Sequence, residues 1–182
     1  MKITLVRHGE TDWNSKNKLQ GRENAELNDK GRRQCKALRD KIKDNKYDVC
    51  YMSPLLRTVE TAMILIGDRV EMIPDKRLIE RDLGNLEGVD RSKYNQKLYW
   101  DYKLNCSTDG VEAIQDVFKR CNDFISYIKE KYDEDASILV VTHATPYRAI
   151  HHILNNTDLN GKIDILNVVN CSIEEIETNK NI

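Results

Sequence analysis

Two histidines and two arginines stand where short apolar runs of this sequence end. Arg7 and His8 directly follow the run "ITLV", His143 directly follows the run "SILVVT", and Arg57 lies in "SPLLRT", just after a third run. Ligands of open α/β sheets bind beyond the carboxyl ends of the strands. If the apolar runs are strands of one sheet, these four side chains meet at one edge of it.

Two arginines and two histidines together suit a phosphoryl group better than a metal ion. Guanidinium groups repel a divalent cation, and a metal site would be expected to contain carboxylates. Arginine binds phosphate oxygens two at a time and keeps its charge. A neutral imidazole can attack phosphorus, and neighbouring cations keep His8 neutral. Gly9, without a side chain, leaves room for the phosphate or allows a tight turn.

Composition limits the class of protein and the partners that we expect. The chain has 182 residues, 29 basic and 30 acidic, with a net charge of −1. Such a balance argues against a nucleic-acid groove and a basic membrane-binding face. No apolar run approaches the roughly 20 residues that cross a bilayer, and the first apolar run is too short for a signal peptide. Five scattered cysteines without a CxxC pair indicate reduced thiols. We therefore expect a cytoplasmic protein.

The elements that position these residues alternate along the chain. Runs without polar alternation are typical of strands buried on both faces of a parallel sheet. Strands are expected at 3–6, 48–52, 70–74 and 137–142, and the segment 163–177 is expected to end the sheet with a strand around Val168 to Ile176. Apolar residues at helical spacing predict helices at 28–43, 55–66 and 108–132, and another follows Pro146. This order predicts a single α/β domain over 1–182: a three-layer α/β/α sandwich around a mostly parallel sheet, with a small lid segment.

Four segments of the sequence resemble the signature blocks of a known family. "LVRHGETDWN", "SPLLRTVETA", "LIERDLGNLEG" and "VVTHATPYRAI" are similar to those of the histidine phosphatase superfamily, in the branch that includes the cofactor-dependent phosphoglycerate mutases. The blocks occur in the order found in the family and extend over residues 5 to 150. An RHG triplet alone would be weak evidence for this family, whereas four blocks in the family's order are specific evidence.

The resemblance implies a mechanism and a set of residues. His8 would attack phosphorus and become phosphohistidine, which water would then hydrolyse. Glu80 would be the general acid for the leaving oxygen, since a neighbouring phosphate dianion favours its protonated form. The remaining residues fall into two groups, those that would hold the phosphoryl oxygens (Arg7, Arg57, His143) and those that would touch the phosphate or substrate (Asn14, Gln20, Gly21, Thr11, Ala144). No metal and no cofactor is implied.

Departures from the family pattern bear on which reaction is expected. Ala144 stands where the family usually has glycine, so its contact with the substrate is in doubt. Leu83 replaces the tyrosine of the mutase branch, and "EG" at 87–88 is typical of the phosphatase branches. These features favour a phosphatase. Two alternatives remain, a phosphoglycerate mutase-type phosphoryl transfer and a non-catalytic module that binds a phosphorylated ligand or a partner.

Residues 89–106 are the expected specificity segment. They carry four aromatic residues and interspersed lysines (Tyr94, Tyr99, Trp100, Tyr102; Lys93, Lys97, Lys103). The segment is either a lid over the leaving group or a helical cap that packs on the core. The expected partner is a small phosphorylated molecule rather than nucleic acid or membrane, and a homodimer remains open.

Overall fold

The computed structural model describes residues 1–161, 163 and 166–178, and its centre is a five-stranded sheet. The strands are β1 (Lys2–Arg7), β2 (Val49–Met52), β3 (Met72–Pro74), β4 (Ser137–Thr142) and β5 (Ile173–Glu177). Their order in the sheet is β3-β2-β4-β1-β5. All neighbouring pairs are parallel except β1 with β5, which are antiparallel. The sheet is therefore mostly parallel, as the sequence predicts.

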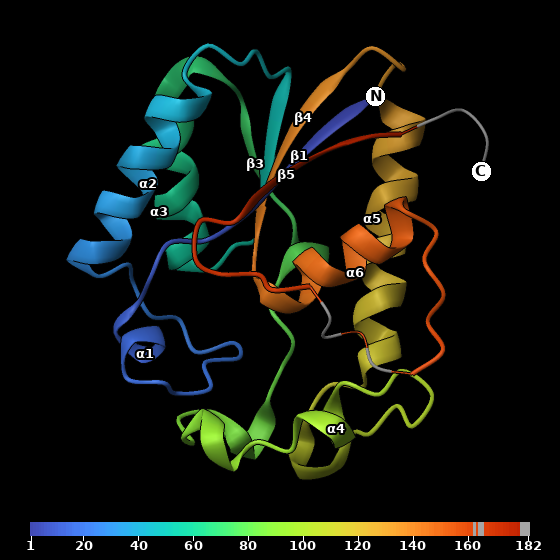
Figure 1. The fold of residues 1–182 in the computed structure, drawn as a ribbon. Coiled ribbons are helices and arrows are strands. Elements are labelled where there is room, and N and C mark those ends of the chain that lie inside the picture. The colour runs from blue at the N-terminus through green and yellow to red at the C-terminus, as the bar shows by residue number, and fades with distance from the viewer. Residues whose placement is uncertain (162, 164–165, 179–182) are drawn as a thin grey trace.

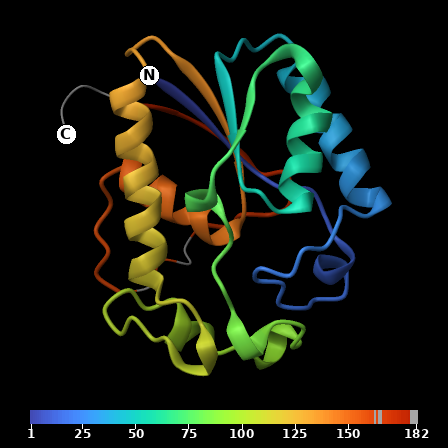
Figure 2. The ribbon, with the colours of Figure 1, turned by 180° about the vertical axis from the view of Figure 1, so that it is seen from behind.

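Two pairs of helices cover the two faces of this sheet (Figures 1 and 2). On one face α2 (Asp29–Ile42) and α3 (Leu56–Ile66) pack against Val6, Cys50 and Val141. On the other face α5 (Ile114–Lys131) and α6 (Ala144–Leu154) pack against a second set of strand residues. Successive side chains of a strand point to opposite faces, so each central strand contributes to both cores. The expected three-layer fold is confirmed.

The remaining short elements gather beyond the carboxyl ends of the parallel strands (Figure 1). They are α1 (Asp12–Ser15), α4 (Gln96–Tyr99) and 3-10 turns at Lys76–Leu78, Gly84–Leu86, Arg91–Lys93 and Thr108–Gly110. Another 3-10 turn, Gly67–Arg69, follows α3. The loops and short helices of the chain therefore surround the edge at which ligands of such sheets bind.

Helix α2 shows how local sequence fixes the segment after β1. The side chain of Asn28 caps the helix by accepting the backbone N–H of Gly31 at 2.8 Å. Gly31 packs directly on the backbone of Glu10, where a side chain would collide. The absence of a Cβ therefore lets the first turn of α2 lie against the residues that follow His8.

Three predicted element boundaries are wrong. The last strand begins at Ile173, not near Val168, because Val168 is buried in a loop and its apolar character reflects that packing. Residues 164 and 165 of the same predicted segment lie outside the described residues. The long helix begins at Ile114, after a separate turn in which Asp109 has φ +59°. The last helix begins at Ala144, so Pro146 lies within its first turn, where a missing N–H costs no helical hydrogen bond.

Candidate active site

Strand register brings the two histidines together. Arg7 pairs with Thr142 in the β1–β4 ladder, so His8 and His143 leave the sheet at the same level. The backbone N–H of His8 donates to the Thr142 carbonyl at 3.0 Å. The two imidazole rings meet edge to face with centroids 5.2 Å apart. Residues 135 positions apart in sequence are thus neighbours because two parallel strands end side by side.

The environment of His8 favours a neutral imidazole with a defined tautomer. Its Nδ1 lies 2.7 Å from the carbonyl oxygen of Gly9, so Nδ1 donates a proton and Nε2 carries the lone pair. The side chain is buried. Burial lowers the pKa of His8 well below its ordinary value, and Arg57 and Arg7 lower it further. The imidazole is therefore neutral at pH 7, with an unprotonated Nε2 that needs no deprotonation before it can react.

Arg57 is buried, Arg7 is half-buried, and both stay charged. Burial lowers the pKa of both Arg7 and Arg57 to about 10, which still leaves each guanidinium protonated at pH 7. Arg57 donates to the carbonyls of Glu23 and Gly21 at 2.7 and 2.8 Å. Arg7 donates from one terminal nitrogen to the Val168 carbonyl at 2.7 Å, whereas its buried Nε has no partner. An unpaired buried donor beside His8 is suited to an anion.

His143 is fixed from both sides of its ring. The Nε of Arg57 donates to Nδ1 of His143 at 3.1 Å, and Nε2 of His143 then donates to the Ser53 hydroxyl at 2.7 Å. Burial lowers the pKa of His143 well below its ordinary value, and the charge of Arg57 lowers it further. His143 is fully buried and lies behind the pocket wall instead of lining it.

Glu80 lies at the start of α6. Its two carboxylate oxygens accept the backbone N–H groups of Ala144 and Thr145 at 3.1 and 3.2 Å. A third bond, at 2.8 Å, comes from the N–H of Arg81. A negative charge is favourable at a helix N-terminus, where the first N–H groups have no helical partner. The N–H of Ala144, which the resemblance assigns to the substrate, is therefore occupied by Glu80 in this structure.

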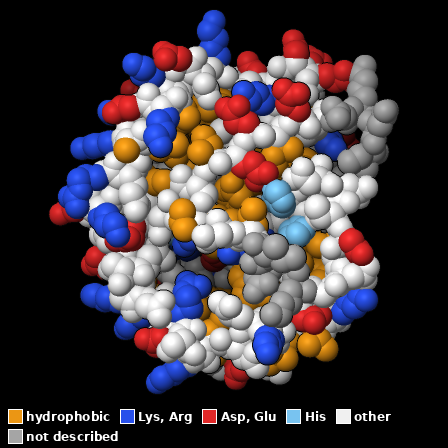
Figure 3. Space-filling model, in the orientation of Figure 1, with side chains coloured by type: hydrophobic (Ala, Val, Ile, Leu, Met, Phe, Trp, Pro, Cys, Tyr) orange, Lys and Arg blue, Asp and Glu red, His pale blue; other side chains and the backbone are white. Residues whose placement is uncertain are grey.

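A cavity of about 350 Å³ connects these residues. Figure 3 shows this face of the molecule hollowed below its middle, with Lys and Arg side chains at the border. The site residues expected from the sequence that line the cavity are Arg7, His8, Asn14, Gln20, Gly21, Arg57, Glu80 and Ala144. His143 and Thr11 do not line it. The structure thus brings most of the expected set around one pocket, with the other two adjoining it.

The polar residues after β1 form a connected group. Thr11 and Asn14 cap α1 reciprocally, the backbone N–H of Asn14 donating to Thr11 Oγ1 and that of Thr11 to Asn14 Oδ1, both at 3.2 Å. The hydroxyl of Thr11 donates to Gln20 Oε1 at 3.1 Å. The amide nitrogen of Gln20 is buried without a partner and is a second donor suited to an anion. Thr11 therefore contacts Gln20 and Asn14, which line the pocket, but does not line it itself.

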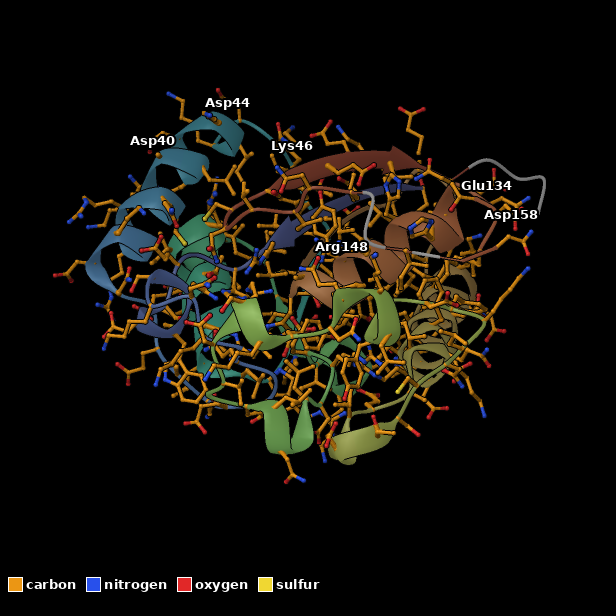
Figure 4. The ribbon with its side chains drawn as sticks, turned by 60° about the horizontal axis from the view of Figure 1, so that its bottom comes forward. Asp40, Asp44, Lys46, Glu134, Arg148 and Asp158 are labelled. Carbon is orange, nitrogen blue, oxygen red and sulfur yellow. The ribbon has the colours of Figure 1, made fainter. Side chains whose placement is uncertain are left out.

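Two pocket residues that sequence reasoning missed come from the last third of the chain. Asn170 donates from its amide nitrogen to the His8 carbonyl and to Asn14 Oδ1, both at 3.1 Å. Arg148 stacks on the Trp100 ring at 4.8 Å and donates to the carbonyls of Leu166 and Ala144. Figure 4 shows Arg148 on α6 near the centre of the view, whereas Asp40 and Asp44 lie at its margin. The sequence signal for Arg148 is its place four residues, or about one helical turn, after Ala144 on the same helix. No pattern in the sequence points to Asn170.

The segment 89–106 both packs on the core and lines the pocket. Tyr94, Tyr99 and Trp100 are buried in the same apolar cluster as β1 and β4. Tyr94 and Trp100 also line the cavity. The lysines of the segment are exposed. The segment therefore packs on the core and also lines the pocket, and its role as a lid over the leaving group stays a prediction.

Among the described residues, no cluster of three or more histidine, cysteine, aspartate or glutamate side chains has the arrangement of a metal site. Within residues 1–161, 163 and 166–178, no helix has the length and apolar character needed to cross a membrane.

The two buried histidines predict a loss of stability in acid. Their pKa values in the folded protein lie well below the value of about 6.5 in the unfolded chain. Below pH 6.5 the unfolded chain therefore binds more protons, and stability falls as the pH falls. We expect each histidine to remove about 2 kcal/mol of unfolding free energy between pH 7 and pH 5.

Urea unfolding at pH 7 and pH 5 measures this loss, and the His8→Ala variant isolates one contribution. The variant should lose about 2 kcal/mol less than the wild type over the same interval. Equal losses in the two proteins would show that His8 binds a proton in the folded state.

Comparison with known proteins assigns the fold and the family. The structure resembles that of Bacillus stearothermophilus YhfR with a TM-score of 0.87 at 26% identity, covering 98% of this chain and 92% of that one. The sequence is 34% identical over 160 residues to "Phosphoglycerate mutase-like protein 4" of Arabidopsis thaliana, covering 82% of this chain and 69% of that protein. It is 30% identical over 166 residues to "Phosphoserine phosphatase 1" of Hydrogenobacter thermophilus, covering 87% and 78%.

A family model described as "Histidine phosphatase superfamily (branch 1)" matches residues 3–181. The match spans nearly the whole chain and includes the four segments that carry the site residues. On this match, together with the relatives and the common fold, the chain belongs to branch 1 of the histidine phosphatase superfamily.

Proposed function

We propose that the protein hydrolyses a small-molecule phosphomonoester through a phosphohistidine intermediate on His8. The observation that carries this proposal is the buried neutral imidazole, with its lone pair on Nε2, beside two charged arginines. The unpaired donors on Arg7 and Gln20 supply hydrogen bonds for phosphoryl oxygens. Membership of the family supports a phosphoric monoester hydrolase.

In the first step Nε2 of His8 attacks phosphorus as the bond to the leaving oxygen breaks. Arg7 and Arg57 stabilise the charge on the phosphoryl oxygens. Glu80, in its protonated form, donates a proton to the leaving oxygen, and the alcohol departs. In the second step Glu80 takes a proton from water, which attacks phosphorus, breaks the N–P bond and releases inorganic phosphate. His8 then returns to its neutral form.

The pocket supports a small substrate. Its volume of about 350 Å³ lies at the lower end of the range for small-molecule sites. Arg91 and Arg148 add positive charge beyond the phosphate-binding residues, and Trp100 supplies an apolar wall. A phosphorylated small acid of the phosphoserine type fits this lining, and the phosphoserine phosphatase of Hydrogenobacter thermophilus is among the relatives.

A phosphate-release screen across phosphorylated small molecules tests this function. We expect hydrolysis of several phosphomonoesters, with phosphorylated small acids among the best, and no net isomerisation of 3-phosphoglycerate. Isomerisation faster than phosphate release would favour the mutase alternative. Failure to hydrolyse any phosphomonoester, including the activated p-nitrophenyl phosphate, would favour the non-catalytic alternative.

A further inference from the structure

Two cysteines far apart in sequence meet next to the active site. Cys35 lies on α2 and Cys171 in the loop before β5, and their sulfur atoms are 3.6 Å apart. A disulfide bond needs about 2 Å, so the sulfurs must approach by about 1.5 Å to form one. The other three cysteines have no cysteine neighbour among the contacts of the described residues. This pair is therefore the candidate for cross-linking in the described part of the chain.

Both segments that carry these cysteines hold the catalytic strand end. The backbone N–H of Cys171 contacts the carbonyl oxygens of Arg7 and His8 at 3.1 and 3.2 Å. The sulfur of Cys35 packs against Gly9. It lies 2.7 Å from the position that a Cβ on Gly9 would take. Gly9 is the residue whose carbonyl fixes the tautomer of His8. A shift of either sulfur therefore acts on the Arg7–Gly9 segment.

The pair is chemically unequal and reachable. Hydrogen bonding from the thiol of Cys171 lowers the pKa of Cys35, and the hydroxyl of Thr61 adds to this effect. The same pairing raises the pKa of Cys171. Cys35 is therefore the better thiolate. Cys171 is partly exposed and lines a second cavity of about 380 Å³, whereas Cys35 is buried and does not line it, so a small oxidant reaches Cys171 first.

We propose that Cys35 and Cys171 are a redox-modification site, at which hydrogen peroxide forms a reversible disulfide that inactivates the enzyme. The sulfur of Cys171 attacks one peroxide oxygen and gives up its thiol proton, the O–O bond breaks, and the hydroxide that leaves is protonated to water. The Cys35 thiolate then attacks the sulfur of the sulfenic acid on Cys171, the S–O bond breaks, and the hydroxide that leaves is protonated to a second water. The two sulfurs lose two electrons, and the peroxide gains them.

The disulfide should lower activity because it pulls together the two segments that place His8. Displacement of a reacting group by about 1 Å can cost on the order of 100-fold in rate. We expect kcat/KM for p-nitrophenyl phosphate to fall about tenfold or more after peroxide treatment, and to recover with dithiothreitol. This inference rests on the proposed function only for its activity readout, since the cross-link itself is measured by mass.

The experiment compares the wild type with Cys171→Ser and Cys106→Ser. Cys106 is also partly exposed but lies in the segment 89–106, away from the pair, and so controls for general thiol oxidation. After peroxide treatment, peptide mapping without reduction should show a Cys35–Cys171 peptide in the wild type and Cys106→Ser. Cys171→Ser should lack this peptide and keep its activity.

Three outcomes would overturn the inference. They are the absence of the cross-linked peptide from oxidised wild type, its presence with unchanged activity, and equal inactivation of Cys171→Ser. Mapping of the wild type needs no variant, so a poorly folded Cys171→Ser leaves the first two outcomes decisive. A reduced wild type without any activity would instead refute the proposed function, while the cross-link would still be judged by mass.

Discussion

Replacing His8 with alanine is expected to abolish turnover and leave the fold intact. The substitution removes the nitrogen that would form the bond to phosphorus, and none of the other described residues that line the pocket carries an imidazole. Loss of a covalent nucleophile costs on the order of 10⁴-fold or more in kcat. The fold should persist because β1 and its ladder with β4 depend on residues before His8. Steady-state phosphate release and circular dichroism measure the two effects.

A matched control is His151→Asn. His151 lies on α6 outside the pocket and pairs with Glu174 at 2.8 Å, so this variant should retain the activity of the wild type. The wild type should also carry acid-labile phosphate after rapid quenching with substrate, and His8→Ala should carry none. Turnover of His8→Ala within tenfold of the wild type would remove His8 as the nucleophile.

Replacing Glu80 with glutamine is expected to slow the reaction according to the leaving group. A glutamine cannot donate the proton that an alkoxide needs, whereas p-nitrophenolate departs without one. General acid catalysis contributes on the order of 10²- to 10⁴-fold, so kcat for an alkyl phosphate should fall by that amount. The rate of phosphorylation of His8 by p-nitrophenyl phosphate should change little. Single-turnover measurements with both substrates separate this step from hydrolysis of the phosphoenzyme.

The control for Glu80→Gln is Asp82→Asn. Asp82 lies two residues away, binds Arg22 at 3.3 Å and does not line the pocket. Its variant should treat both substrates alike. A glutamine side chain still offers its carbonyl oxygen to the N–H groups of Ala144 and Thr145, so the start of α6 keeps an acceptor. If Glu80→Gln slowed phosphorylation by both substrates equally, Glu80 would position the helix or the substrate without acting as the acid.

Much of the fold is predictable because its signals are local. Strand β4 has the limits that its apolar run predicts, since a strand buried on both faces has no polar position within it. Asn28 caps α2 because a short polar side chain before an apolar helical pattern reaches the first free N–H groups. The boundary errors at 108–114 and 168–173 arise where apolar residues pack into the core from loops, which have no periodicity.

The sequence by itself determined that Arg7, His8, Arg57 and His143 leave strands or begin helices at one edge of a parallel sheet. Strand direction and chain connectivity are enough for that conclusion. Only the tertiary structure decided that Glu80 lies on the first N–H groups of α6, that Asn170 holds the backbone of His8, and that Cys171 meets Cys35. These contacts join residues 64 to 162 positions apart. They depend on how loops pack against the finished sheet, and local propensity carries no information about that packing.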